Sequence, residues 1–181
     1  MKLIEIKKNA FDVEIDLKYA SRDNILNKKI FRENQCFLLE AAADKLLDAI
    51  TIAKKLGYHF KIFDAYRPSY VQEALWEFDP NPNFLSDPKK GSPHTKGIAI
   101  DLTLTDLQGN ELEMGTKFDD FTEKAYHLSK DLDKQVRFNR HLLLSIMTLA
   151  GFDFYHKEWW HYQLFNASDY PLIKNFFDNK I

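Results

Sequence analysis

One segment, Gly97 to Leu104, constrains the fold of this chain more than any other. Its residues alternate with a period of two, so that one face carries only apolar side chains, those of Ile98, Ile100, Leu102 and Leu104. This period predicts a β-strand whose apolar face belongs to the core. The opposite face carries Asp101 between the small residues Ala99 and Thr103, which is typical of a strand that lines a cavity.

Two long amphipathic helices are predicted, one before and one after this strand along the chain. The first spans about 35–56 and is followed by Gly57, and the second spans 134–150 and is followed by Gly151. In each of them apolar residues recur at spacings of three and four, and a glycine directly after the last turn is a common way to end a helix.

The remaining predicted elements are short. In the N-terminal half we expect an extended arm over 1–20 with an edge strand near 13–17, a loop over 18–24, a strand over 58–66, a helix over 70–78 capped by Ser69, and an irregular loop over 79–91 that forms a wall or lid. Next come a turn over 106–110 with a hairpin partner near 111–113 and a short helix from Asp119 or Asp120 to about 128. The C-terminal part is predicted to form a strand-like run over 152–165 and a last helix over 170–177 capped by Ser168. This order lacks the regular alternation of a parallel α/β fold. It predicts an α+β fold with a small, mainly antiparallel sheet and flanking helices.

Length and composition narrow the function classes. The chain has 181 residues, 45% of them apolar, which predicts one domain over residues 1–181. Its formal charge is −2 with scattered Lys and Arg, so we expect no nucleic-acid partner. No run approaches the ~18 apolar residues of a membrane span, and the N-terminus turns polar at once. These features predict a cytoplasmic protein with no membrane partner, and they leave the oligomeric state open.

Two separate motifs carry residue types that suit a metal ion. The first contains His94 and Asp101, and the second is Glu158-Trp159-Trp160-His161. The single cysteine, Cys36, adjoins Phe37 and is predicted to be buried, which leaves His, Asp and Glu as metal ligands.

A zinc ion would satisfy this set of side chains. A carboxylate in the middle of a strand, as Asp101 is, is costly to bury without a partner or a metal. Two imidazoles and one carboxylate form an open three-ligand site, in which zinc lowers the pKa of a bound water to about 7. Glu158 is then free to take the proton of that water.

A local break in the backbone is needed for this arrangement. Glu158 and His161 are three residues apart, so in a regular strand their side chains would point to opposite faces. A bulge or turn at Trp159-Trp160 is therefore predicted. Arg67, at the end of the strand over 58–66, is placed to stabilise an oxyanion; the alternative is an exposed arginine or an ion pair with Asp64.

Four motifs in register resemble the zinc D-alanyl-D-alanine dipeptidases. They are Asp64-Ala65-Tyr66-Arg67-Pro68, Ser92-x-His94-x-x-Gly97-x-Ala99-x-Asp101, Met114-Gly115-Thr116-x-Phe118-Asp119, and Gly151-Phe152 followed by Glu158-Trp159-Trp160-His161. The resemblance begins near Asp16 and runs past His161, so it covers most of the chain.

The resemblance implies a role for each matching residue. His94, Asp101 and His161 would be the zinc ligands, Glu158 the general base, and Arg67 the residue that polarises the scissile carbonyl. Asp119 and the region of Ser92 would hold the ends of the substrate, with the arm around Tyr19 as a further candidate at the amino end. The implied fold is that of the Hedgehog and D,D-peptidase group, and the implied substrates are small D,D-dipeptides.

Two departures from the family pattern bear on substrate preference. The chain has Asn24-Ile25-Leu26-Asn27 where the family tends to continue Asn-Phe-x-Gly, and Pro93 where the family often has a basic residue. Two other functions therefore remain open: a D,D- or L,D-carboxypeptidase that acts on cell-wall peptides, and a Hedgehog-like zinc-binding domain without catalysis. A dipeptidase must close its cleft at the amino end, whereas a carboxypeptidase must leave that end open.

Overall fold

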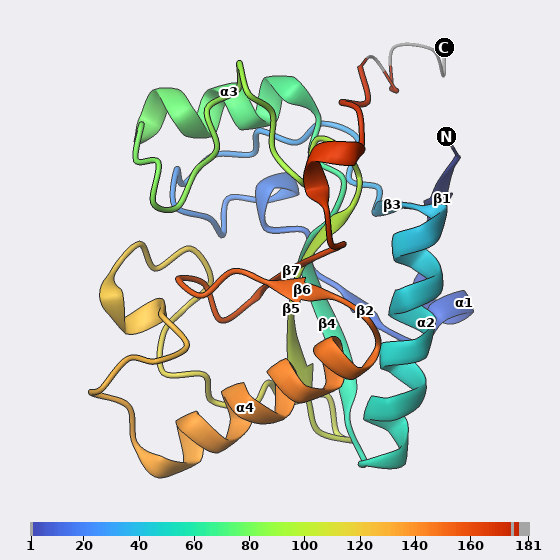
Figure 1. Ribbon diagram of the computed structural model, residues 1–181, viewed down its shortest axis with the longest axis vertical. Coiled ribbons are helices and arrows are strands. Elements are labelled where there is room, and N and C mark those ends of the chain that lie inside the picture. Colours follow the sequence, from blue (N-terminus) through green and yellow to red (C-terminus); the bar gives the residue numbers. More distant parts are fainter. Residues whose placement is uncertain (1, 175, 178–181) are drawn as a thin grey trace.

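A five-stranded sheet forms the centre of the molecule (Figure 1). The computed structural model describes residues 2–174 and 176–177. The strand order is β2-β4-β5-β7-β6, with bounds Glu14–Ile15, His59–Asp64, Ala99–Thr105, His161–Gln163 and Asp153–Phe154. Only β2 and β4 are parallel; the other three pairs are antiparallel. The predicted α+β fold with a small, mainly antiparallel sheet is therefore confirmed.

The N-terminal arm forms the edge of this sheet and a second, smaller sheet. The edge strand predicted near 13–17 is β2, followed by the 3₁₀ turn η1 (Lys18–Ala20), and the short helix α1 (Lys8–Phe11) precedes it. Strand β1 (Leu3–Glu5) pairs with β3 (Phe37–Leu39) in an antiparallel two-stranded sheet. The helix expected from about 35 therefore begins later than predicted, because Phe37, Leu38 and Leu39 pair with the arm.

The two long helices pack around the sheet. Helix α2 spans Glu40–Lys55, and α4 spans Lys134–Leu149. Both predicted glycines follow their helices in the left-handed region, with φ of 82° at Gly57 and 92° at Gly151. At the start of α4, the side chain of Asp133 accepts a hydrogen bond from the backbone N–H of Val136, which caps the helix.

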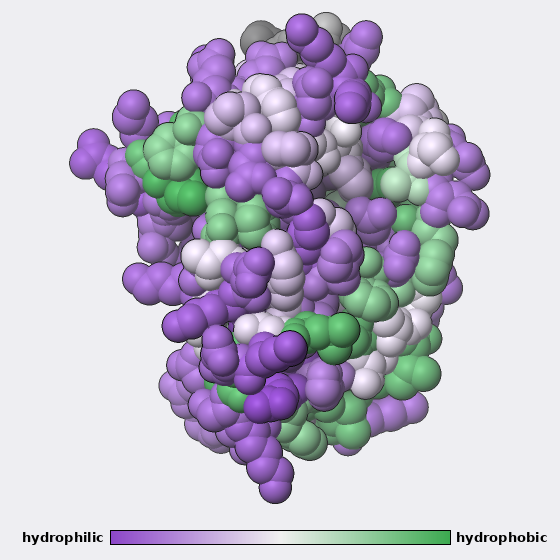
Figure 2. Space-filling model, turned by 60° about the vertical axis from the view of Figure 1, so that its left-hand side comes forward, coloured by the Kyte–Doolittle hydropathy of each residue, from purple (hydrophilic) through white to green (hydrophobic). Residues whose placement is uncertain are grey.

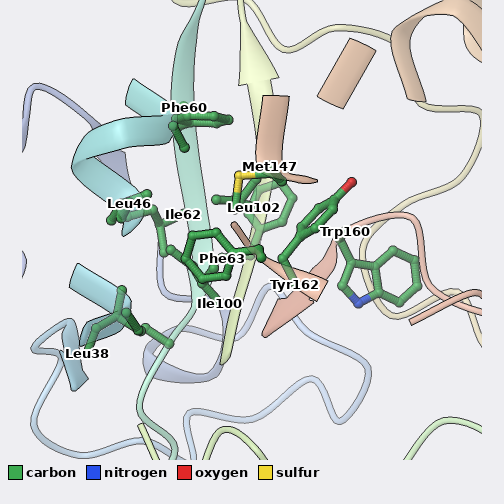
Figure 3. Packing of buried hydrophobic residues seen from close by; sticks show 14 of the residues in the cluster. Leu38, Leu46, Phe60, Ile62, Phe63, Ile100, Leu102, Met147, Trp160 and Tyr162 are labelled. Carbon is green, nitrogen blue, oxygen red and sulfur yellow. The ribbon is translucent and has the colours of Figure 1, made fainter. Parts of the chain in front are cut away.

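The apolar face of β5 lies in the core, as its alternation predicts. Leu102 and Leu104 are paired with Ile62 and Phe60 of β4. Figure 3 shows Phe60, Ile62 and Leu102 together with Leu46 of α2 and Met147 of α4, and all of these residues belong to one buried cluster. All seven residues of β5 are buried, so its second face also lies away from solvent.

A β-bulge in β4 changes which side chain lies beside Asp101. Ile62 pairs with Leu102, but the next pair joins Asp64 to Asp101, so Phe63 has no partner of its own in β5. Without this extra residue, Phe63 would face Asp101. The bulge instead aligns the carboxylate Asp64 with Asp101 and directs the chain toward Arg67.

Several short elements differ from the prediction. Ser69 is the first residue of α3 (Ser69–Phe78), and no side chain caps that helix. The helix expected from Asp119 or Asp120 is only the 3₁₀ turn η2 (Glu123–Ala125), which Thr122 caps. The residue Glu111 does pair with Thr105, as the predicted hairpin requires, in an isolated bridge.

The C-terminal part is less helical than predicted. The run over 152–165 divides into β6 and β7, with turns between them. The helix expected over 170–177 is wrong: a 3₁₀ turn, η3 (Ala167–Asp169), ends before it, and residues 170–174 are irregular. Pro171 contributes to this difference, since proline has no N–H to donate and disfavours the helical conformation of the residue before it. Residue 175 of the expected helix lies outside the described residues.

Hydrophilic residues cover most of the face shown in Figure 2, and hydrophobic residues form small separate patches there. Cys36 is buried, as predicted. Within residues 2–174 and 176–177, no helix has the length and apolar character needed to cross a membrane.

Candidate active site

His94, Asp101 and His161 meet at one end of the central sheet. Asp101 is opposite His161 in the register of β5 and β7, and His94 lies in the turn that leads into β5. All three side chains are buried, and each offers a ligand atom within 4.8 Å of the other two. The pairing of β5 with β7 thus joins two motifs that are 60 residues apart in the sequence.

The spacing of these atoms suits a four-coordinate metal ion. His94 Nε2 lies 3.1 Å from His161 Nδ1, and the Asp101 oxygens lie 3.3 Å and 3.0 Å from those two nitrogens. Ligands at the 2.0–2.1 Å distances of zinc, arranged tetrahedrally, are separated from one another by about 3.3 Å. The donor set therefore fits such an ion, with a fourth position left for water or substrate.

The outer nitrogen of each imidazole is already engaged. His94 Nδ1 lies 2.8 Å from the carbonyl oxygen of Ala65, which can only accept, so Nδ1 carries the proton and Nε2 is left with its lone pair. His161 Nε2 lies 3.0 Å from Gln163 Oε1, which leaves Nδ1 of that ring directed at the site. Such outer partners fix the tautomer and orientation of metal-binding histidines. Sequence reasoning missed Gln163, although its position two residues after His161 in a strand places both on one face.

The charges of Asp101 and His161 are strongly coupled. Burial would raise the pKa of Asp101, but the two adjacent imidazoles outweigh it and hold that pKa well below its usual range. Burial would lower the pKa of His161, but the hydrogen bond and charge of Asp101 raise it to about 9. Without a metal ion, the proton on His161 compensates the buried carboxylate, and this proton competes with a metal cation for Nδ1 of that ring.

Glu158 approaches the same site from the turn before β7. Its Oε2 lies 3.8 Å from His161 Nδ1, and its side chain is buried. Trp159 and Trp160 are turn residues, which confirms the predicted break in the strand alternation between Glu158 and His161. Burial raises the pKa of Glu158 to about 8, while the nearby His161 opposes this change.

Arg67 lies just past the end of β4 and is held by two buried side chains. Its Nε donates to Asp64 at 2.7 Å, and its Nη1 donates to Gln72 at 2.8 Å. Its Nη2 lies 3.6 Å from Asp101. The alternative of an exposed arginine is therefore wrong, while the ion pair with Asp64 is present and orients the guanidinium toward the site. Sequence reasoning did not find Gln72, which reaches Arg67 from α3.

Tyr19 and Asp119 form another part of the wall of the cleft that the metal ligands line. The Tyr19 hydroxyl donates to Asp119 Oδ2 at 2.8 Å, and the Tyr19 ring lies 5.0 Å from the Arg67 guanidinium carbon. Asp119 has a φ of 60°, in the left-handed region, and its side chain is buried. Burial raises the pKa of Asp119 to about 7, although the positive charge of Arg67 opposes the increase.

These residues line a single cleft of about 250 Å³. Ser92 lies on it too, and its hydroxyl accepts a hydrogen bond from the backbone N–H of His94 at 3.2 Å. Residues 82–86 of the loop after α3 form another side, as predicted for a wall or lid. This loop is fastened across the cleft, because the Tyr155 hydroxyl donates to the carbonyl oxygen of Asn83 at 2.8 Å.

An open three-ligand donor set with a spare carboxylate and a cleft beside it is the arrangement that hydrolytic metalloenzymes use. Comparison with known proteins agrees with this class. The family described as D-ala-D-ala dipeptidase matches residues 1–180. The D-alanyl-D-alanine dipeptidase of Escherichia coli K12 is 42% identical over 166 residues, which cover 92% of this chain and 86% of that protein. The enzyme of the same name from Enterococcus faecium is 33% identical, covering 92% of this chain and 91% of that protein.

The chain therefore belongs to the D-ala-D-ala dipeptidase family. It is a metallopeptidase, and its family implies a metal cofactor. The α+β fold is that expected from the Hedgehog and D,D-peptidase group.

Proposed function

We propose that this protein is a zinc dipeptidase that hydrolyses D-alanyl-D-alanine to free D-alanine. The observation that carries this proposal is the buried Asp119 carboxyl in the cleft wall, which accepts a 2.8 Å hydrogen bond from the Tyr19 hydroxyl and offers a partner for a substrate ammonium group. The family and its relatives, whose names specify a D-alanyl-D-alanine dipeptidase, support the same substrate.

His94, Asp101 and His161 are the proposed zinc ligands. Bound zinc supplies a Lewis acid and lowers the pKa of a coordinated water to about 7. Ala65 and Gln163 hold the two imidazoles in the tautomers that leave their inner nitrogens free. Asp101 contributes the negative charge of the set, since its low pKa keeps it ionised at neutral pH.

Glu158 is the proposed general base. The reaction requires a group that accepts a proton from the attacking water and later returns it to the leaving amine. The buried carboxyl of Glu158, 3.8 Å from a proposed ligand nitrogen, is suited to both steps because its pKa of about 8 is near the working pH. A divalent cation beside it lowers this pKa, which favours the ionised form that begins the cycle.

Arg67 is the proposed stabiliser of the oxyanion. Asp64 and Gln72 hold its guanidinium in place, so it need not reorganise when negative charge develops on the carbonyl oxygen. The carboxylate of Asp64 is directed at Nε, which leaves Nη2 facing Asp101 and the cleft. Burial of all these groups strengthens the interaction, because few water molecules screen it.

The ends of the dipeptide are assigned to different walls. Asp119 binds the substrate ammonium group, and the Tyr19 hydroxyl holds the Asp119 carboxylate in place. The Ser92 region binds the other end of the dipeptide. A carboxypeptidase would need an open path at Asp119 for the rest of its peptide. The buried Asp119 carboxyl in the wall and a cleft of about 250 Å³ favour the dipeptidase over that alternative.

We infer further that residues 1–181 form one catalytic domain, that it works in the cytoplasm, and that its partner is a small dipeptide. The cytoplasmic location is supported by the absence, among the described residues, of a helix able to cross a membrane. The scattered positive charges argue against a nucleic-acid partner.

One experiment separates the three candidate functions. Release of free D-alanine from D-Ala-D-Ala is measured beside an N-acetylated analogue, with and without a chelator. A dipeptidase hydrolyses only the free dipeptide, and the chelator abolishes this. Hydrolysis of the blocked analogue at an equal rate would support a carboxypeptidase. Zinc bound in stoichiometric amount without any hydrolysis would support a binding domain instead.

A further inference from the structure

A buried arginine outside the cleft holds the loop that carries Asp119. Arg140 of α4 is only 1% exposed. Its Nε donates to the carbonyl oxygen of Met114 at 2.7 Å, and its Nη1 donates to those of Lys124 and Tyr126, both at 2.9 Å. In the described part of the chain, no carboxylate lies within ion-pair distance of it. Burial lowers its pKa to about 10, so it remains charged at neutral pH.

The three carbonyl groups lie at the two ends of one segment, residues 114–126. This segment contains no regular helix apart from the 3₁₀ turn η2, and Asp119 lies between its ends. The Arg140 guanidinium therefore sets the distance between the two ends of residues 114–126. The loop between these ends brings Asp119 to the cleft. Gly115 lets the segment approach α4, since a Cβ at this position would lie 2.8 Å from Val136 Cγ1.

Trp159 joins the same segment to the turn that carries Glu158. Its indole Nε1 donates to Thr116 Oγ1 at 2.8 Å, and its backbone N–H donates to the carbonyl oxygen of Ala125 at 3.2 Å. The Arg140 guanidinium carbon lies 5.9 Å from the Trp159 ring. The segment that carries Asp119 and the turn that carries Glu158 are thus fastened to each other and to α4.

We propose that Arg140 is a positioning residue for the dipeptide, acting with Trp159 to fix Asp119 at the correct distance from Glu158. The proposal rests on the proposed function, in which these two carboxylates lie at the amino end and at the scissile bond. Neither Arg140 nor Trp159 lines the cleft, so both act through other residues. Lysine could not replace Arg140, because one ammonium group lacks the planar fork that spans both ends of the segment.

Arg140→Lys tests the proposal, with Arg137→Lys as the matched control. Arg137 lies on the same helix and is exposed, and its guanidinium donates to the carbonyl oxygen of Leu132. Loss of the charged hydrogen bonds to one end of the segment is expected to raise KM for D-Ala-D-Ala about tenfold in Arg140→Lys. We expect kcat to change less than about threefold, and zinc content to stay at the wild-type value. A merely destabilised protein would lose active molecules, which lowers kcat and leaves KM unchanged.

A double-mutant cycle shows whether Arg140 acts through Asp119. In an Asp119→Asn background, Arg140→Lys should no longer raise KM, because the residue that it positions has lost its charge. An equal rise in both backgrounds would overturn the proposal. Should Arg140→Lys fail to fold, Thr116→Val removes the acceptor of Trp159 and should raise KM about threefold in the same manner.

The outcomes distinguish this proposal from the proposed function. Wild-type protein that releases no D-alanine overturns the proposed function, and the role of Arg140 with it. Active wild-type protein together with an unchanged KM in both Arg140→Lys and Thr116→Val overturns the positioning role alone. A raised KM in these variants and an unchanged KM in Arg137→Lys supports both.

Discussion

Asp119 provides a direct test of the proposed substrate binding. Its ionised carboxylate would bind the substrate ammonium group, but ionising this buried side chain lowers the stability of the folded protein. Burial raises its pKa from 3.8 to about 7. Between these two pH values the folded protein retains a proton that the unfolded chain has lost. The contribution of Asp119 to the free energy of unfolding therefore falls as the pH rises from about 4 to 7, and then stays level.

The size of the effect follows from the same two pKa values. At 1.36 kcal/mol per pKa unit, a carboxyl raised from 3.8 to about 7 costs about 4 kcal/mol of stability above pH 7. Asp119→Asn removes this cost, because the amide stays neutral and its oxygen still accepts the Tyr19 hydroxyl bond. The variant should match wild-type protein near pH 4 and exceed it by up to about 4 kcal/mol at pH 8.

Urea unfolding of both proteins between pH 4 and 8 measures the difference in their free energies of unfolding. Metal-depleted protein is used so that the charge of a bound metal ion does not affect the pKa of Asp119. The same variant, loaded with zinc, should have a KM for D-Ala-D-Ala raised about a hundredfold, since it no longer pairs with the substrate ammonium. A constant difference in stability across the pH range would refute the buried, protonated state of Asp119. An unchanged KM would refute its contact with the substrate.

Three further predictions concern other parts of the structure. Gln163→Leu removes the acceptor of His161 Nε2 and should weaken zinc binding about 10- to 100-fold in a competition titration; an unchanged affinity would exclude this role. Tyr155→Phe removes one of the two hydrogen bonds that hold Asn83 at the cleft wall, the other coming from Lys157 Nζ, and should raise the cleavage of a D-Ala tripeptide relative to the dipeptide, with under about 1.5 kcal/mol lost in stability. An unaltered ratio would show that the Tyr155 bond does not restrict substrate length. Burial lowers the pKa of His127 to about 4, so the unfolded chain takes up the proton first as the pH drops. The contribution of His127 to the free energy of unfolding therefore falls between about pH 6.5 and 4, and His127→Phe should reduce the slope of stability against pH in this range. Equal slopes for both proteins in urea titrations would contradict this prediction.

The elements that the sequence predicted correctly are those that local patterns determine. The alternation around Asp101 and the spacing of apolar residues in α2 and α4 are properties of single segments, and each was confirmed. The turn at Trp159-Trp160 followed from the requirement that Glu158 and His161 share one side.

The wrong predictions concern elements that depend on distant residues. Phe37–Leu39 joins a strand instead of a helix because β1 pairs with it. The loop around Asp119 is not helical, because its carbonyl groups bind Arg140 instead of continuing a helix. The β4 bulge that aligns Asp64 with Asp101 depends on a register between strands, which no single segment reveals.

The central claim is that Glu158 acts as the base beside a zinc ion held by His94, Asp101 and His161. The most direct measurement is D-alanine release by Glu158→Gln protein in which bound zinc is quantified in the same sample. We predict zinc equal to that of wild-type protein and a kcat lower by at least about a thousandfold, since the amide cannot accept the proton. Wild-type turnover at full zinc occupancy would contradict the account.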